Sequence, residues 1–211
     1  MGRYIEANCK LCRREGEKLF LKGARCLTEK CAVEKRAYAP GQHGQSGGRR
    51  RKASQYSRQL REKQKVKRIY GLNEQQFRNT FQRVLREDGV TGSNLLIALE
   101  SRLDNIVYRL GFAASRKAAR QLVGHGHVEV NGRRVDIPSY HLKPGDEIRV
   151  RAGSKELESV AVALDLASKG QTVPWIAVDR EARAGKITER PSRDTIPVAA
   201  EEQLIVELYS K

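Results

Sequence analysis

The chain has 211 residues, with 41 Lys and Arg against 25 Asp and Glu, and a net charge of +16 at pH 7. This length allows one large or two ordinary domains, while no stretch is long and apolar enough to span a membrane. Residues 1–68 hold 20 basic and 6 acidic side chains, and a positive field so concentrated favours a nucleic-acid partner over an anionic membrane. The first residues lack an apolar signal core, so we expect a cytoplasmic protein whose cysteines stay reduced.

Residues 1–53 are expected to form a cysteine-containing metal-binding module and a basic arm. Two residues separate Cys9 from Cys12, and four separate Cys26 from Cys31. Zinc prefers four tetrahedral ligands of this kind, although an iron–sulfur cluster uses the same ligand set, and four reduced structural cysteines remain an alternative. Zinc is the favoured metal. Basic neighbours are expected to lower the pKa values of the thiols and so to favour thiolate ligands, namely Lys10, Arg13, Arg25 and Lys30.

Residues 54–92 are predicted to form a helical RNA-binding domain. Ser54 has the character of an N-cap for a basic helix that ends at Gly71. Asn73 and Gln76 have the spacing of a capping box, which predicts the start of the next helix.

Residues 93–152 are predicted to form a second, smaller RNA-binding domain. Leucines and an isoleucine recur with a helical period over residues 96–110, which predicts one continuous helix ending at Gly111. Another helix is expected to begin at Ser115. Beyond it the apolar period changes to two, and the Asn-Gly turn at residues 131–132 predicts a β-hairpin.

Residues 153–211 are expected to pack back on the core as one helix and short strands. The helix is predicted near residues 155–168, and the strands at Ile176–Asp179, Lys186–Arg190 and Leu204–Tyr209. The fold class is therefore α+β. It combines an N-terminal cysteine or metal knot and a basic helical domain with a small helix-turn-helix and β-hairpin RNA-binding domain that has antiparallel strands.

The helix at Ser115 offers free backbone amides at its N-terminus, where a phosphate binds well. Arg116, Lys117 and Arg120 are expected to line its exposed side, and the hairpin arginines to extend this cationic strip. Together with the basic first third, the candidate RNA-binding residues are Arg3, Lys10, Arg13, Arg14, Lys22, Arg36, His43, Arg49, Arg50, Arg51, Lys52, Tyr56, Arg58, Arg61, Lys63, Lys65, Lys67, Arg68, Ser115, Arg116, Lys117, Arg120, Arg133 and Arg134.

Residues 101–151 resemble the small RNA-binding domain named after ribosomal protein S-four, which also occurs in pseudouridine synthases, tyrosyl-tRNA synthetases and a heat-shock RNA-binding protein. The rest of the chain resembles the bacterial S-four ribosomal family in the motifs Met1-Gly2-Arg3-Tyr4, Cys9-x2-Cys12-Arg13-Arg14-Glu15-Gly16, Pro40-Gly41-Gln42-His43-Gly44, Leu60-Arg61-Glu62-Lys63-Gln64-Lys65 and Gln76-Phe77-Arg78. Domains of this kind grip structured RNA by shape and backbone contacts.

The resemblance implies a structural constituent of the small (30S) ribosomal subunit, and a primary 16S rRNA-binding protein that nucleates assembly of the subunit body. It also implies contact with ribosomal proteins S-five and S-three, a contribution to translational accuracy with S-five, and a place near the path by which mRNA enters. In such proteins the domain at residues 101–151 is inserted in a larger helical domain, to which the C-terminal tail returns.

Two other classes of protein compete with this interpretation. An RNA-modifying enzyme would need a catalytic constellation, but no Ser/His/Asp set, phosphate loop or paired carboxylates stand out. His43, His125 and His127 have no evident partners for acid–base chemistry, so no enzyme and no organic cofactor are expected. A zinc-finger transcription factor would share the basic charge and the cysteines, and comparing rRNA with duplex DNA as ligands separates it from an rRNA-binding protein.

Overall fold

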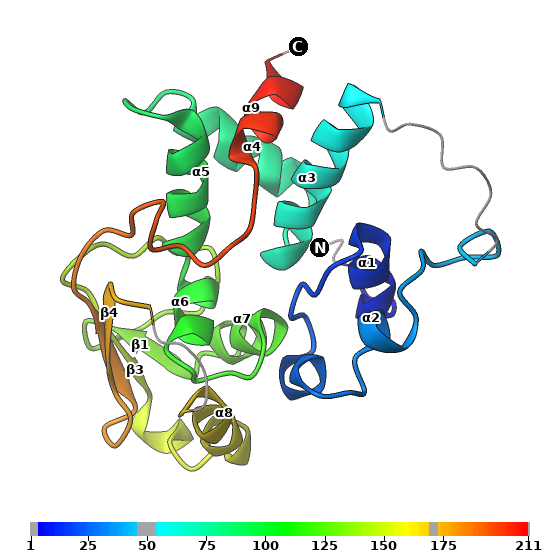
Figure 1. The fold of residues 1–211 in the computed structure, drawn as a ribbon. Coiled ribbons are helices and arrows are strands. Elements are labelled where there is room, and N and C mark those ends of the chain that lie inside the picture. Colours follow the sequence, from blue (N-terminus) through cyan, green and yellow to red (C-terminus); the bar gives the residue numbers. More distant parts are fainter. Residues whose placement is uncertain (1–3, 46–53, 169–172, 211) are drawn as a thin grey trace. The chain divides into compact units, whose positions relative to one another are not determined.

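The computed structural model describes residues 4–45, 54–168 and 173–210 (Figure 1). The chain divides into two compact units, Met1–Gly92 with Ala199–Lys211, and Ser93–Val198. The divisions between these units lie at residues 92 and 93 and at residues 198 and 199, and the four predicted domains stay predictions. Among the described residues, no helix has the length and apolar character needed to cross a membrane.

The first unit is helical, and the two predicted helix caps in it are confirmed. Ser54 accepts a hydrogen bond from the backbone of Ser57 at 3.2 Å, and Asn73 and Gln76 form a complete capping box. These caps satisfy backbone N–H groups that a helix start leaves without partners. The elements are α1 (Asn8–Glu15), η1 (Gly23–Leu27), α2 (Ala32–Lys35), α3 (Gln55–Ile69), α4 (Glu74–Val84) and α9 (Glu202–Tyr209).

The C-terminal segment of this unit is a helix, so the strand predicted at Leu204–Tyr209 is wrong. Ile205 on α9 is fully buried, the side chain of Gln59 on α3 donates a hydrogen bond to Glu207 at 2.8 Å, and the ring of Tyr209 stacks on Phe81 with centroids 4.6 Å apart. Helix propensity is a weak prior that tertiary packing overrides. Burial against α3 and α4 therefore decides the conformation of this segment.

The second unit combines helices with one antiparallel five-stranded sheet, whose strands lie in the order β2-β1-β3-β5-β4. This mixed architecture confirms the α+β class. Its helices are α5 (Thr91–Glu100, which begins at the boundary between units), α6 (Leu103–Arg109), α7 (Arg116–Gly124), η2 (Ala152–Ser154) and α8 (Glu158–Ser168). Its strands are β1 (Val128–Val130), β2 (Arg133–Arg134), β3 (Glu147–Val150), β4 (Ile176–Asp179) and β5 (Ala184–Ile187).

The continuous helix predicted over residues 96–110 is wrong, because it is broken between α5 and α6. Arg102 is extended at the break, with φ −74° and ψ 140°. The backbone N–H groups of Leu103 and Asp104 donate to the carbonyl oxygens of Tyr140 and Pro138, at 2.8 and 3.1 Å. A distant loop thus satisfies the new helix N-terminus, and the periodicity of the sequence carries no sign of that loop.

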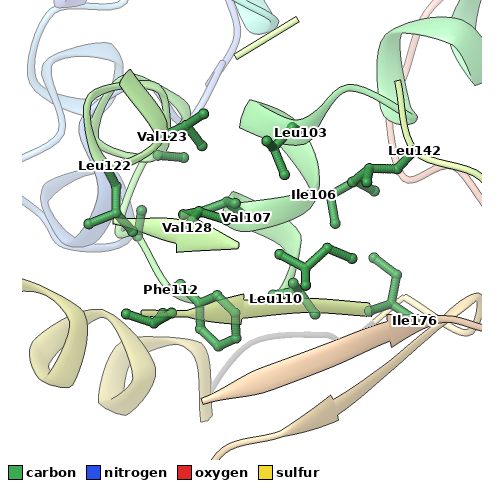
Figure 2. Packing of buried hydrophobic residues seen from close by; sticks show 14 of the residues in the cluster. Leu103, Ile106, Val107, Leu110, Phe112, Leu122, Val123, Val128, Leu142 and Ile176 are labelled. Carbon is green, nitrogen blue, oxygen red and sulfur yellow. The ribbon is translucent and has the colours of Figure 1, made fainter. Parts of the chain in front are cut away.

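The break allows α6 to enter the core between α7 and the sheet. Figure 2 shows Leu103 and Ile106 of α6, Val123 of α7 and Val128 of β1 around this core. The hairpin predicted at residues 131–132 is confirmed, since Asn131 and Gly132 both have positive φ (50° and 76°), as a type I′ turn requires. The strands predicted at Ile148 with Val150 and at Ile176–Asp179 are confirmed. The strand predicted at Lys186–Arg190 is displaced, because β5 begins two residues earlier, at Ala184, and ends three residues earlier, at Ile187.

Because Ile205 fills a fully buried position on α9, Ile205→Ala is expected to lower the free energy of unfolding of the first unit by about 2–4 kcal/mol, through lost burial and a residual cavity. Chemical denaturation followed by circular dichroism measures the change. Gln203→Ala, at an exposed position of the same helix, is the matched control, and it is expected to change stability by less than about 0.5 kcal/mol. Equal effects of the two substitutions would contradict the packing of α9.

Candidate RNA-binding site

Five of the predicted RNA-binding cations on α3 pair with carboxylates of the same unit. Arg61 and Arg68 both contact the carboxylate of Glu15 on α1, Arg61 at 3.3 Å. The side chain of Glu15 is only 3% exposed, and burial raises the pKa of this carboxyl even though the two arginines oppose the change. A buried carboxylate shared by two guanidinium groups therefore ties α1 to α3.

The other three paired cations of α3 are lysines. Glu74, the first residue of α4, accepts hydrogen bonds from Lys63 at 2.5 Å and from Lys67 at 2.7 Å. Burial opposes ionisation of Glu74, but the hydrogen bonds and charges of the two lysines outweigh it and lower the pKa of the carboxyl to about 2. Lys65 pairs with Glu62 at 2.7 Å. Each of the five paired cations thus has a structural role, and its contact with RNA stays a prediction.

The four cysteines are free thiols, and Cys12, Cys26 and Cys31 are buried. Burial raises the pKa values of Cys12 and Cys26, and the charges of the neighbouring cysteines raise them further. The predicted lowering of thiol pKa by basic neighbours is therefore wrong for these two residues. Within the described residues, which include all four cysteines, no three His, Cys, Asp or Glu side chains form a group that could hold a metal ion. The structure thus does not support the expected metal knot.

The start of α7 has its predicted cap, but its arginines do not form the predicted exposed strip. Ser115 accepts a hydrogen bond from the backbone N–H of Ala118 at 3.3 Å. The side chains of Arg116 and Arg120 are only 12% and 13% exposed, and Lys117 between them is half-buried. The expectation that the two arginines line an open face is therefore wrong, because carboxylates at the junction of α5 and α6 draw them inward.

Two buried carboxylates organise this junction. Asp104 accepts hydrogen bonds from Nε and Nη2 of Arg102, at 3.0 and 2.7 Å, and from Nη1 of Arg120 at 3.1 Å. Glu100 is fully buried and accepts from Nε and Nη2 of Arg109, at 3.0 and 2.7 Å. Paired, forked hydrogen bonds of this kind fix a guanidinium group in orientation as well as position.

The hairpin presents its two predicted cations to solvent. Arg133 and Arg134 are exposed on β2. The Arg134 guanidinium packs closely against Gly126. A β-carbon at position 126 would therefore collide with the Arg134 side chain. The ring of His127 is 2.9 Å from the hydroxyl of Ser154, which identifies a structural contact for this histidine.

The remaining predicted RNA-binding residues fall into three groups. The first group has partners within the first unit, and it comprises Arg13 and Lys10. Arg13 donates to the carbonyl oxygen of Tyr38 at 3.0 Å and lies over the Tyr38 ring, and Lys10 pairs with Glu6 at 3.5 Å. A second group is exposed, and it comprises Arg14, Lys22, Arg36, His43, Tyr56 and Arg58. A third group lies outside the described residues, and it comprises Arg3, Arg49, Arg50, Arg51 and Lys52.

Sequence reasoning missed the carboxylates that hold these cations. Glu100 follows Leu96 by four residues on the apolar stripe of α5, and a charged residue on a stripe that faces a core indicates a buried pair. That signal could have identified Glu100. The partners of Glu15, Glu74 and Glu100 all come from other helices, so the sequence pattern does not identify those partners.

Comparisons with known proteins cover the whole chain. Residues 3–100 match the family model described as ribosomal protein S4/S9 N-terminal domain, and residues 101–148 match the S4 domain. The chain is 56% identical over 212 residues to the small ribosomal subunit protein uS4 of Thermus thermophilus. It is 54% identical over 211 residues to the uS4 of Natranaerobius thermophilus and 55% identical over 211 residues to that of Koribacter versatilis. Each match covers 100% of both chains.

Because the pKa of Glu74 is about 2 in the folded protein, its pairing stabilises the fold above the unfolded pKa near 4.3, and this contribution is lost as the pH falls toward 2. Glu74→Gln is expected to lower the free energy of unfolding at pH 7 by about 1 kcal/mol, a value discounted because the side chain is 47% exposed. The difference in the free energy of unfolding between Glu74→Gln and the wild type should shrink to near zero by pH 2. Thermal unfolding of both proteins between pH 7 and pH 2 measures this difference. Glu87→Gln, at an exposed position, is the control, and a pH-independent difference for Glu74→Gln would contradict the assignment.

Proposed function

Because the chain belongs to the ribosomal protein S4 family, we propose that it is a structural constituent of the small ribosomal subunit that binds 16S rRNA as a primary binder and nucleates assembly of the subunit body. The full-length similarity to uS4 proteins, with both the N-terminal domain and the S4 domain matched, carries this proposal. The chain is not an enzyme, since its family consists of ribosomal proteins.

The exposed cations give the proposed rRNA contacts their physical basis. Arg58 near the start of α3 and the hairpin residues Arg133 and Arg134 present guanidinium groups to solvent. Phosphate contacts of this kind position a protein on RNA, and structured RNA is recognised mainly by its shape and backbone. We include Ser115, Arg116, Lys117 and Arg120 in the same surface, although the side chains of the two arginines are only 12% and 13% exposed.

The partners inferred beyond rRNA rest on the family alone. We infer contacts with ribosomal proteins S-five and S-three, a location beside the path by which mRNA enters, and a contribution to translational accuracy with S-five. This role places the protein in the cytoplasm, on the ribosome.

We infer that Cys9, Cys12, Cys26 and Cys31 hold one zinc ion, with an iron–sulfur cluster as the alternative. The residue types support this proposal, because four free thiols fall within residues 9–31 and that of Cys12 interacts electrostatically with the other three, although as they lie in this structure no three of the described thiols form a metal-binding group. The backbone N–H of Lys22 also donates to Cys26 Sγ at 3.4 Å, a contact that steadies metal-bound thiolates. Zinc would supply folding free energy to a module with a small apolar core.

The salt dependence of binding tests the proposed rRNA surface. Arg133→Ala/Arg134→Ala is expected to weaken 16S rRNA binding by about 2 kcal/mol and to flatten the slope of log affinity against log salt by about one for each phosphate that the variant no longer neutralises. Arg180→Ala, exposed on the same unit, is the control. Wild-type protein should bind rRNA more tightly than duplex DNA at equal salt, and equal affinity for the two would favour a DNA-binding protein.

The metal proposal predicts about one equivalent of zinc per purified chain, measured by elemental analysis. Cys26→Ser is expected to lose the metal and to loosen residues 4–45 while leaving the second unit folded, as hydrogen exchange measures for each segment. Iron with sulfide would select the cluster instead. Neither metal in protein purified without chelators would overturn the proposal.

A further inference from the structure

Six charged side chains at the junction of α5, α6 and α7 form a cluster in which arginines outnumber carboxylates by two to one. We call this the arginine–carboxylate cluster, and its members are Glu100, Arg102, Asp104, Arg109, Arg116 and Arg120. All have side chains that are 13% exposed or less. The cluster therefore keeps a positive excess close to the surface while its acidic members lie deeper.

We propose that Asp104 and Asn105 are positioning residues for RNA binding, which hold the guanidinium groups of Arg120 and Arg116 in the orientation that receives phosphate. This inference rests on the proposed rRNA-binding function. It adds which residues set the orientation of the two guanidinium groups. It predicts that removing a negative charge from the protein weakens its binding to a polyanion, which is the opposite of the simple electrostatic effect.

The contacts of Arg120 support the role of Asp104. Asp104 stands in the first turn of α6, where its backbone N–H donates to the carbonyl oxygen of Pro138 at 3.1 Å. Arg102 occupies the carboxylate with two hydrogen bonds, at 3.0 and 2.7 Å, and so fixes its plane. Oδ2 then accepts from Arg120 Nη1 at 3.1 Å. Arg120 Nη1 is thus anchored to a carboxylate whose orientation is set by its two hydrogen bonds with Arg102.

Asn105 has the matching role for Arg116. Its side-chain amide donates to the Glu100 carbonyl oxygen at 2.9 Å and to Glu100 Oε2 at 2.7 Å, which sets the orientation of its own oxygen. That oxygen accepts from Arg116 Nε at 2.8 Å. The Arg116 guanidinium also lies over the ring of Tyr108, 4.6 Å from the centroid, a favourable cation–π distance. A polar anchor and an aromatic face together hold Arg116.

Orientation matters because a long side chain loses conformational freedom when it binds. An arginine ordered beforehand avoids most of that entropic cost when phosphate arrives. The carboxylates also neutralise part of the repulsion among four arginines, which allows the positive charges to stay together. Both effects favour RNA binding, and the share of each that Asp104 supplies is lost if Asp104 loses its charge.

The test uses the full-length protein and measures 16S rRNA affinity together with thermal unfolding. Affinity is measured at a temperature where the protein is folded. Asp104→Asn is expected to weaken rRNA binding about 3- to 10-fold, the range for ordering one long side chain. Glu129→Gln removes a carboxylate that pairs with Arg151 at 3.5 Å in the same unit, and as the matched control it should leave affinity unchanged or slightly higher. Tighter or unchanged binding by Asp104→Asn would overturn the positioning role.

Variants of Arg120 separate this inference from the proposed function. Arg120→Ala should weaken binding, and Asp104→Asn should add little further loss in the Arg120→Ala background. If Arg120→Ala binds rRNA normally, this face does not contact RNA and both the positioning role and this part of the proposed surface are wrong. If only Asp104→Asn binds normally, the positioning role alone is wrong.

A substitution that keeps the charge decides the matter if Asp104→Asn does not fold. Arg120→Lys preserves one positive charge but removes the forked guanidinium that Asp104 orients. Weaker rRNA binding by Arg120→Lys, with unfolding close to wild type, is the expected result. Wild-type affinity would show that charge alone acts at this position and would overturn the proposal.

Discussion

Repulsion among clustered cations is the constraint on which both units of this protein depend, and a few carboxylates, most of them buried, offset it. In the first unit Glu15 joins two arginines of α3 to α1, and Glu74 joins two lysines of α3 to α4. In the second unit Glu100 and Asp104 serve the same purpose at the junction of α5 and α6. A basic chain can therefore fold before RNA neutralises it.

The features that were predicted correctly are those that neighbouring residues determine. The capping box at Asn73 and the turn at Asn131 each depend on a few consecutive side chains. The break before Leu103 and the helical state of residues 204–209 were missed, because a loop at Pro138–Tyr140 and packing against α3 decide them. The segments that decide these two conformations are distant in sequence, so local propensity and periodicity do not predict their contacts.

The cysteine module shows two physical effects in competition at the same side chains. Basic neighbours favour the thiolate, but burial disfavours any charge, and at Cys12 and Cys26 burial prevails. The positions of the charges could be read from the sequence, whereas the extent of burial could not. A bound metal ion would add a strong local positive charge that favours the thiolate, so the proposed zinc and the acidity of these thiols depend on each other.

The predicted RNA surface changes once the internal ion pairs are known. The total charge of +16 sets the long-range attraction to RNA, but counterion release counts only the cations that contact phosphate. Arginines and lysines already paired with carboxylates have part of their charge neutralised, so they contribute less to the salt-dependent affinity than exposed residues such as Arg58 and Arg133. The cations held by Glu15, Glu74 and Asp104 then act mainly by shaping the surface, and the exposed cations supply most of the salt-dependent affinity.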